Sequence, residues 1–558
     1  MDGKAFLDQF GHIADSAGGI VKLRELVLQF AIRGLLTETT GDSATAIAVE
    51  FRQAFKKKLA PVKDDAPFTL KDGWEWLRIG EALNLVNGKA FKPTDWSNDG
   101  LRIIRIQNLN NANAPFNCCD NEVDEKFHVR DGDLLISWSG TPGTSFGAFI
   151  WQRGHALLNQ HIFRSELRCE RGLLAEFTRL AVNSQLDAMI AQAHGGVGLR
   201  HITKGKLEAL PIPLPPLAEQ KRIVAKVDEL MGLLDELDRQ QAQREEVRQA
   251  ACVSVLHHLT APTDDSDQPT KPAPWPRLQR NFNTLIQTPT DVQELRKTIL
   301  QLAVTGRLVE QDESDEPAEK LLLAIGEQRK ELIAEKLIRL KKVASISEDE
   351  WPYVLPSSWR WSRIGGLARN VEYGTSQKAS EEAVGVPVLR MNNIRDGALD
   401  YAKLKYVPND IDDLPRLFLE SGDIIFNRTN SFELVGKTAL YRGPKDSVTF
   451  ASYLIRVQLL EGVGPEFVNI AMNAAYFRRT QIEPQIVQQC GQANFNGTKL
   501  QSTLIPIPPR KEQDRIVSRV NELMTLCDQL EQQLTDHQTT ATQLTKSLTA
   551  GVLNGGGE

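Results

Sequence analysis

The stretch Pro213-Leu-Pro-Pro-Leu-Ala-Glu-Gln-Lys-Arg-Ile-Val224 occurs a second time in this chain, as Pro506-Ile-Pro-Pro-Arg-Lys-Glu-Gln-Asp-Arg-Ile-Val517. Aligned at an offset of 293, residues 213–237 and 506–530 are identical at 15 of 25 positions. A repeat with this level of identity predicts two copies of one structural unit. The other segments of the chain are therefore interpreted as parts of one copy or the other.

Three weaker matches lie upstream of each copy, in the same order and at offsets of 272, 285 and 285. They indicate a duplicated unit of about 280 residues with small insertions. Between 101 and 200, compared with 386–492, the agreement falls to scattered positions, so a shared frame carries two divergent domains. The matched segments are Leu23-Arg24 with Leu295-Arg296, Trp74-Glu-Trp76-Leu-Arg78-Ile-Gly80 with Trp359-Arg-Trp361-Ser-Arg363-Ile-Gly365, and Arg105-Ile-Gln-Asn108 with Arg390-Met-Asn-Asn393.

The frame is predicted to be helical. Pro215-Pro216 must precede the first helix, because proline is not tolerated in a helix interior. Apolar residues then recur in alternating steps of four and three, which is typical of a coiled-coil seam. Two such seams favour pairing of the helices with each other; the alternative is that each helix packs only on its own domain. The seam residues are Ile223, Val227, Leu230, Leu234 and Leu237, and Ile516, Val520, Leu523, Cys527, Leu530 and Leu534.

The composition is that of an ordinary globular protein: 558 residues, 41% hydrophobic, 25% charged and a net charge of −6. Six cysteines without a CxxC pair argue against a disulfide scaffold or a zinc site and favour a reducing compartment. No signal peptide and no run of 18 apolar residues is found. We therefore expect a cytoplasmic protein of several domains.

The expected fold class is α+β. The two variable domains carry short β-type runs such as Asp133-Leu-Leu-Ile-Ser-Trp138 and Asp423-Ile-Ile-Phe426, broken by Gly, Asp and Asn. Five prolines between 260 and 282 predict an extended linker between the halves. The predicted division is an N-terminal helical segment (1–67), a first variable domain (68–212), a helical region (213–260), a Pro-rich linker (261–284), a helical segment (285–350), a second variable domain (351–508) and a second helical region (509–558).

Motifs for catalysis are weak in this sequence. Gly436-Lys437-Thr438 resembles the end of a phosphate-binding loop, but the glycine required five positions before Gly436 is Ser431. A hairpin turn is the favoured interpretation, and a nucleotide-binding enzyme is kept as an alternative. No metal-ligand set and no Asn/Asp-Pro-Pro-aromatic motif for base flipping is found. We expect no catalytic residues and no metal site in this chain.

Candidate binding residues cluster at strand ends of both variable domains. Arg pairs with guanine and Asn or Gln with adenine in the major groove, so these residue types are suited to recognising bases; the alternative is that they form solvated turns. The candidates are Arg102, Arg105, Gln107, Asn108, Ser137, Trp138, Ser139, Thr141, Asn159, Gln160 and His161 in the first domain, and Arg390, Asn392, Asn393, Asn427, Arg428, Thr429, Ser452, Tyr453, Gln492 and Asn494 in the second.

Charge limits how such domains could bind DNA. Residues 71–210 carry 16 basic and 16 acidic side chains, and residues 351–508 carry 17 and 15. Nearly neutral domains lack the phosphate attraction that normally dominates DNA affinity. If this chain recognises DNA, a partner has to supply much of the grip on the duplex.

Taken together, the layout resembles the specificity (S) subunit of Type I restriction–modification systems. The resemblance rests on the doubled 213–224 and 506–517 segments, the Trp-x-Trp openings, the Gly-Asp-hydrophobic runs at 132–136 and 422–426, and residues 198–207. It covers nearly the whole chain. It implies two β-rich target recognition domains separated by long helices that form an antiparallel coiled coil, with internal pseudo-two-fold symmetry.

The resemblance also implies a function and partners. Each recognition domain would recognise one half of a split, asymmetric DNA target, and the coiled coil would fix the gap between the halves. Two modification (M) subunits would dock on the helical frame and restriction (R) subunits would join them, with S-adenosylmethionine, ATP and Mg bound by the partners and none by this chain. A protein-binding coiled-coil adaptor is the remaining alternative. The predicted coiled-coil and docking residues are Glu219, Gln220, Arg222, Ile223, Val227, Leu230, Glu512, Gln513, Arg515, Ile516, Val520 and Leu523.

Overall fold

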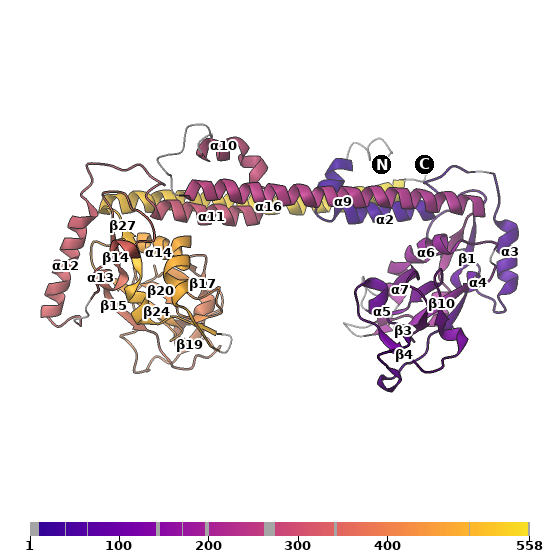
Figure 1. Cartoon of the computed structure of the whole chain (residues 1–558), viewed down its shortest axis with the longest axis horizontal. Helices are drawn as coiled ribbons and strands as arrows, with labels where there is room; N and C mark the ends of the chain where they lie inside the picture. Colours follow the sequence, from indigo (N-terminus) through magenta and orange to yellow (C-terminus); the bar gives the residue numbers. More distant parts are fainter. Residues whose placement is uncertain are drawn as a thin grey trace. The chain divides into compact units, whose positions relative to one another are not determined.

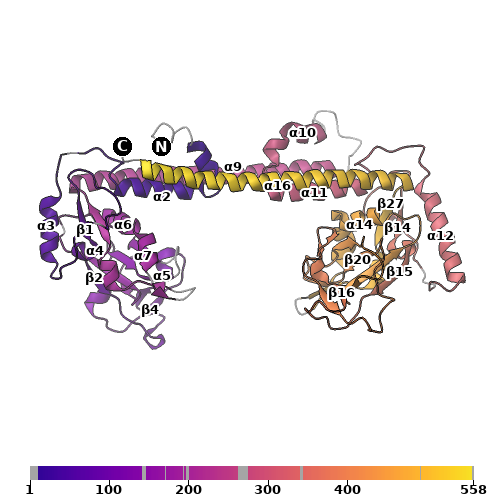
Figure 2. The ribbon, with the colours of Figure 1, turned by 180° about the vertical axis from the view of Figure 1, so that it is seen from behind.

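The structure is a computed structural model and is shown in Figures 1 and 2. It describes residues 10–39, 41–63, 65–140, 146–169, 171–192, 194–195, 200–261, 274–339, 343–489 and 492–555. The chain forms two compact units: unit 1 comprises residues 1–244 and 538–558, and unit 2 comprises 245–537. Two long helices, α9 (Leu217–Thr260) and α16 (Arg510–Gly555), contribute to both units. Among the described residues, no helix has the length and apolar character needed to cross a membrane.

The recognition domain of unit 1 is built on an antiparallel sheet of β2 (Leu83–Asn87), β10 (Ile162–Leu167), β6 (Leu134–Ser137) and β8 (Gly147–Ile150), in that order. A second sheet has the order β4 (Asn117–Cys119), β3 (Leu101–Ile104), β9 (Ala156–Leu158) and β5 (His128–Val129), with β3 and β9 parallel. The domain opens with β1 (Glu75–Arg78), which pairs with the closing strand β13 (Pro211–Leu214). Its helices are α3 (Thr45–Ala54), α4 (Ile79–Ala82), α5 (Ile106–Asn110), α6 (Ala175–Asn183), α7 (Leu186–Gln192) and α8 (Lys204–Glu208), and β7 (Ser139–Gly140), β11 (His194–Gly195) and β12 (Arg200–His201) form a small sheet.

The recognition domain of unit 2 repeats this topology. Its main sheet is β15 (Ala368–Tyr373), β24 (Leu454–Leu459), β20 (Ile424–Asn427) and β22 (Thr438–Leu440), and β14 (Arg360–Arg363) pairs with β27 (Leu504–Ile507). The parallel pair recurs as β16 (Val386–Leu389) with β23 (Thr449–Phe450). The predicted α+β class with internal duplication is therefore confirmed. The remaining elements include β17 (Ile394–Arg395), β18 (Ala398–Leu399), β19 (Lys405–Val407), β21 (Thr429–Asn430), β25 (Val487–Gln489), β26 (Gln492–Asn494), α13 (Ile364–Leu367), α14 (Pro465–Asn473) and α15 (Gly497–Ser502).

Each unit also contains a helical core made from both long helices. In unit 1, Leu234 of α9 packs with Leu23 and Leu26 of α2 (Gly19–Ile32), and Leu548 of α16 packs against the same cluster. In unit 2, Leu256 near the end of α9 shares a core with Val520 near the start of α16. The start of one helix thus meets the end of the other, as an antiparallel pair requires.

The two interpretations of the heptad seam are both correct, each for part of the helix. Ile223 and Val227 belong to the core of the recognition domain in unit 1, whereas Leu234 packs with helices. In unit 2 the helical core includes α11 (Pro289–Val304) beside α16, as Figures 1 and 2 show. The first turns of α9 therefore anchor the domain, and later turns form the helical bundle.

An ion pair supports the duplication of the frame. Arg24 on α2 contacts Asp235 at 2.6 Å, and Arg296 on α11 contacts Asp528 at 2.7 Å. Arg24 and Arg296 belong to the upstream repeat, and the two aspartates are separated by the 293-residue offset of the downstream repeat. Both matched segments therefore meet in space, once in each unit.

The prediction of an extended linker over 261–284 is wrong for its second part. Residues 274–285 form the helix α10 (Pro274–Leu285), and Leu278 and Leu285 are buried in the core of unit 2. Pro274 and Pro276 lie in the first turn, where the missing N–H groups would have no intrahelical partner. Prolines therefore mark the beginning of a helix here. Residues 262–273 lie outside the described part of the chain. Within the helical segment predicted over 285–350, the structure has α11 (Pro289–Val304) and α12 (Ala318–Ala334).

Candidate nucleic-acid interface

The doubled Arg-x-x-Asn motif forms a tight turn in each recognition domain. The side chain Oδ1 of Asn108 accepts from the backbone N–H of Arg105 at 3.0 Å, and Asn393 accepts from Arg390 at 2.9 Å. Both asparagines are buried, and each Nδ2 donates to backbone carbonyls further along the chain, such as that of Asp400 at 2.8 Å. Because these amides are fully engaged, Asn108 and Asn393 build the turn, and we remove them from the candidate base-recognising set.

The end of β6 carries an aromatic site in unit 1. Trp138 stacks on Phe163 with ring centroids 5.7 Å apart, and His161 packs against the same indole at 5.7 Å. Trp138 is half-buried between two buried serines, Ser137 and Ser139. Within the described residues, Nε1 of Trp138 and Nδ1 of His161 are buried and have no hydrogen-bond partner. The described residues thus leave two polar positions unsatisfied on adjacent aromatic rings at the end of β6.

The end of β20 carries a cationic site in unit 2. The guanidinium of Arg428 lies 5.0 Å from the ring centroid of Tyr373, and its Nη1 donates to the carbonyl of Ser452 at 3.2 Å. The hydroxyl of Tyr373 accepts from the N–H of Gly497 at 2.8 Å, which fixes the ring under the guanidinium. Tyr453 beside it is 46% exposed. Arg428 is thus held in one position by an aromatic ring and a carbonyl while its side chain is only half-buried.

These two sites occupy the same position in the two domains. The N–H of Trp138 donates to the carbonyl of His161 at 3.4 Å, and that of Arg428 donates to Tyr453 at 3.0 Å. On the other side, the carbonyls of Trp138 and Arg428 accept from Ile202 and from Phe495 at 3.0 and 2.9 Å. One backbone frame therefore presents Trp and His in unit 1 and Arg and Tyr in unit 2.

The other predicted residues divide between these sites and the domain interior. Thr429 donates to Asn494 Oδ1 at 2.9 Å beside Arg428, and Gln160 Nε2 lies 3.3 Å from His161 Nε2. Asn427 is buried and donates to the carbonyl of Leu434 at 3.0 Å. Thr141 and the side chain of Gln492 lie outside the described residues. Arg102, Gln107 and Asn392 are exposed on the second sheet and its turns, and Arg105, Asn159, Arg390 and Ser452 are half-buried.

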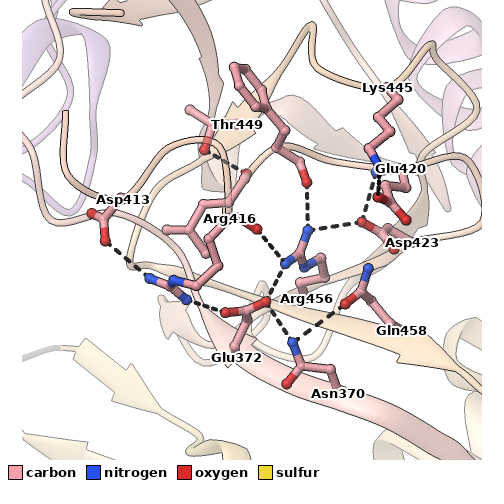
Figure 3. Close-up of polar contacts among 12 residues, drawn as sticks. Asn370, Glu372, Asp413, Arg416, Glu420, Asp423, Lys445, Thr449, Arg456 and Gln458 are labelled. Atoms are coloured by element: carbon pink, nitrogen blue, oxygen red, sulfur yellow. Dashed lines mark hydrogen bonds and ion pairs between the residues drawn. The ribbon is translucent and has the colours of Figure 1, made fainter. Parts of the chain in front are cut away.

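A buried ion network lies on the main sheet of unit 2 (Figure 3). Arg456 on β24 is 3% exposed; it contacts Glu372 on β15, and its Nη1 lies 3.4 Å from Asp423 Oδ2. It also donates to the carbonyls of Phe418 and Arg416, so it holds the preceding loop against the sheet. Burial raises the pKa of Asp423 despite the neighbouring guanidinium.

Sequence reasoning missed this network, although its parts align with unit 1. Arg164 occupies the position of Arg456, but Val86 lies opposite Arg164 where Glu372 lies opposite Arg456. Arg164 contacts Glu166 at 2.9 Å instead. A comparison of the two repeats residue by residue would have found the one-sided carboxylate.

The doubled Glu-Gln pair latches each long helix to its recognition domain. In unit 1, Glu219 Oε2 accepts from Nε1 of Trp74 at 3.0 Å, and Oε1 accepts from Lys71 at 2.8 Å and Thr37 at 3.0 Å. In unit 2, Glu512 accepts from Nε1 of Trp359 at 3.0 Å. The doubled Trp and the doubled Glu are therefore the two sides of one joint.

The glutamine of the pair completes the joint. Gln220 accepts from the N–H of Leu174 and donates to the carbonyl of Gly172, both at 2.9 Å. Gln513 accepts from the N–H of Gly464 at 2.9 Å. A helix N-terminus is thereby tied to the domain through buried side chains on both copies.

These four side chains were predicted as coiled-coil and docking residues; each is at most 1% exposed and is engaged within its own unit, so they hold the helices to the domains, and docking of modification subunits on the helical frame stays a prediction. Ile223, Val227, Ile516 and Val520 are likewise buried. Arg515 contacts Asp315 at 2.7 Å, and Arg222 is exposed. Docking therefore stays a prediction for Arg222, Leu230, Arg515 and Leu523, which are not fully buried.

The phosphate-loop alternative does not fit the structure. The N–H of Gly436 donates to the carbonyl of Asn427 and that of Asn427 to Lys437, both at 2.9 Å, so the segment closes a hairpin between β20 and β22. Thr438 is buried and begins a strand, whereas a phosphate loop leads into a helix. Within the described part of the chain, no three His, Cys, Asp or Glu side chains are grouped to hold a metal ion.

Comparison with known proteins places these features in a family. The family model described as "Type I restriction modification DNA specificity domain" matches residues 71–246 and 356–537. The chain is 27% identical to the Type I restriction enzyme EcoEI specificity subunit and 29% identical to the EcoAI specificity subunit, both from Escherichia coli; each match covers 96% of this chain and 94% of the relative. The chain is 16% identical to the crystal structure of the HsdS subunit from Thermoanaerobacter tengcongensis. The two align with a TM-score of 0.41 over 88% of this chain and 99% of that one.

Proposed function

Because this chain belongs to the family with the Type I restriction modification DNA specificity domain, we propose that it recognises a bipartite, asymmetric DNA target, one half with each recognition domain. The observation that carries the proposal is the site shared by both domains. The same backbone frame offers Trp138 and His161 in unit 1 and Arg428 and Tyr453 in unit 2. Two similar frames with unlike side chains are suited to two different half-targets.

The chemistry of the two sites differs in a definite way. Arg428 keeps donor groups beyond the one that binds Ser452, and a guanidinium can donate two bonds to O6 and N7 of guanine. Trp138 and His161 offer apolar contact and stacking together with a single ring nitrogen each. We therefore propose that Arg428 recognises a guanine in one half-target and that the other half-target is recognised at this position mainly through apolar contact.

Catalysis is assigned to partner subunits. In this proposal modification subunits bind S-adenosylmethionine and methylate adenine, restriction subunits use ATP and Mg, and both join the helical frame of this chain. The nearly neutral charge of the recognition domains supports a partner that supplies additional DNA contacts.

The test is to sequence the methylated sites in cells that carry this chain and its modification subunits. Wild type is expected to give one split motif. Arg428→Ala is expected to relax one base position in one half-target at a cost of about 1–3 kcal/mol in binding, with the other half unchanged. The matched control is Arg395→Ala, an exposed arginine of the same domain that is paired with Asp400 at 3.2 Å. A single unsplit motif, or methylation that does not depend on this chain, contradicts the proposal.

The spacing of the half-targets is tested separately. We propose that the paired helices fix this spacing, so that inserting seven residues into both helices changes the gap in the methylated motif. The insertion in α9 belongs between 238 and 244, since Ile223, Val227 and Leu234 are in hydrophobic cores that an insertion would disrupt. An unchanged gap with retained methylation would rule out this role.

A further inference from the structure

Two arginines of recognition domain 1 lie against one phenylalanine. The guanidinium carbons of Arg102 on β3 and Arg153 after β8 are 5.3 and 5.7 Å from the ring centroid of Phe116. Arg153 also lies 4.5 Å from the centroid of Trp151, and it donates to the carbonyl of Asn108. Aromatic faces stabilise cations, so this cluster is built to hold guanidinium groups in place.

The charge of this pair is not compensated by acids. In the described part of the chain, neither Arg102 nor Arg153 forms an ion pair with a carboxylate, whereas Arg130 of the same domain contacts Glu125 at 2.6 Å. Nη1 of Arg153 is buried and has no hydrogen-bond partner among the described residues. Burial and the neighbouring charge of Arg102 lower the pKa of Arg153. Two guanidinium groups against one ring, both without a carboxylate partner among the described residues and one with an unsatisfied donor, indicate an anionic ligand.

The pair belongs to unit 1 alone. The register of the parallel strands places Pro387 at the position of Arg102, and Gly443 lies three residues after the end of β22 as Arg153 lies three residues after the end of β8. The residues that build the common frame recur in both copies, as the doubled Asn and Glu-Gln do, although the ion network of Arg456 shows that a structural contact can also belong to one copy. A cationic pair present in one copy only is therefore not part of the common framework.

We infer that Arg102 and Arg153 form a clamp for a backbone phosphate of DNA beside the first half-target. The inference rests on the proposed function. It changes the role of Arg102 from recognition of a base to sequence-independent contact, and it supplies a local phosphate contact that the neutral net charge of the domain does not. In this clamp the exposed side chain of Arg102 contacts the phosphate from the solvent side of the domain. Arg153 is held in position by its hydrogen bond to the carbonyl of Asn108 in the Arg-x-x-Asn turn.

The experiment measures DNA binding by the full chain with its modification subunits, as a function of salt, on two probes. One probe is a duplex with the methylated target and the other is an unrelated duplex of equal length. Arg102→Gln is expected to weaken binding to both probes by the same factor, on the order of tenfold, and to lower the slope of log K against log salt by about 0.9. Arg102→Lys retains the charge and is expected to keep the slope near that of wild type.

Controls separate the inference from its alternatives. Arg130→Gln, which removes a paired guanidinium from the same domain, is expected to leave affinity and slope unchanged. An altered methylated motif in Arg102→Gln would show that this residue recognises a base, and unchanged affinity and slope would equally overturn the clamp. Arg102→Gln is the deciding variant, because the side chain of Arg102 is exposed and its replacement leaves the domain core untouched. Failure of wild type to distinguish the two probes would instead overturn the proposed function.

Discussion

Replacing Glu219 by Gln is expected to loosen the joint between α9 and the recognition domain of unit 1. The carboxylate is 1% exposed and accepts three hydrogen bonds, two on Oε1 and one on Oε2. An amide has one acceptor and one donor group. If its oxygen stays with Lys71 and Thr37, its NH2 faces Nε1 of Trp74, and a buried indole N–H loses its acceptor.

The cost follows from these contacts. An unsatisfied buried donor costs about 1–3 kcal/mol, and the loss of the charge-assisted bond to Lys71 adds about 1 kcal/mol. The full penalty of about 3–5 kcal/mol for breaking a buried ion pair does not apply, since Lys71 also donates to the carbonyl of Thr37 at 2.5 Å. We expect a loss of about 3 kcal/mol, which is a large part of the stability of a domain.

Hydrogen exchange followed by mass spectrometry measures this change locally. Peptides that cover β1 and the first turns of α9 are expected to exchange about 150-fold faster in Glu219→Gln. The matched control is Glu229→Gln on the exposed face of α9, where the pair with Lys226 at 2.9 Å is worth less than about 1 kcal/mol. The double variant with Trp74→Phe removes the opposed donor and should recover part of the loss. Equal exchange in Glu219→Gln and Glu229→Gln would refute the latch.

Three further predictions concern unit 2. Burial raises the pKa of Glu512 above its usual 4.5. The contribution of this carboxyl to the free energy of unfolding is therefore fully present below pH 4.5 and is lost as pH rises through its folded-state pKa. Urea midpoints of Glu512→Gln should accordingly fall less between about pH 4 and 7 than those of wild type. Glu372→Gln leaves Arg456 without one of its two acid partners, and calorimetry should show a loss of about 3–5 kcal/mol in the transition of unit 2 alone. Gly306→Ala should cost about 1–3 kcal/mol in urea unfolding, because φ is +71° and a Cβ would lie 2.5 Å from Pro356; a neutral effect would show that the turn relaxes.

Repetition and periodicity predicted the duplicated frame and its paired helices, and the β-type runs predicted the strand-rich domains. The antiparallel direction of the helices was implied by the family resemblance, and the linker prediction over 261–284 failed where α10 begins. The strands predicted from Asp133–Trp138 and Asp423–Phe426 are found as β6 and β20. These features depend on local patterns, which one sequence contains.

The roles of single residues depended on distant contacts instead. Glu219 follows two prolines at a helix start, and its sequence context does not reveal that Trp74, 145 residues away, is its donor. Asn108 has the residue type of an adenine-recognising side chain, but its amide is used within 7 residues of the chain. The available signal was that Asn108 and Glu219 recur in both copies, as Asn393 and Glu512, and prove to be structural, whereas Trp138 and Arg428 differ at one shared position and are the better candidates for specificity.

The sharing of α16 between the units has a consequence for biosynthesis. The bundle of unit 1 includes Leu548, and the hydroxyl of Thr545 is 2.8 Å from that of Ser16. These contacts cannot form until the ribosome has added all of residues 245–537, which takes about 15–60 s at about 5–20 residues per second. During that interval the residues of α2 and α9 that pack with Leu548 lack this contact, so the helical bundle of unit 1 is completed only after the chain of unit 2 has been synthesised.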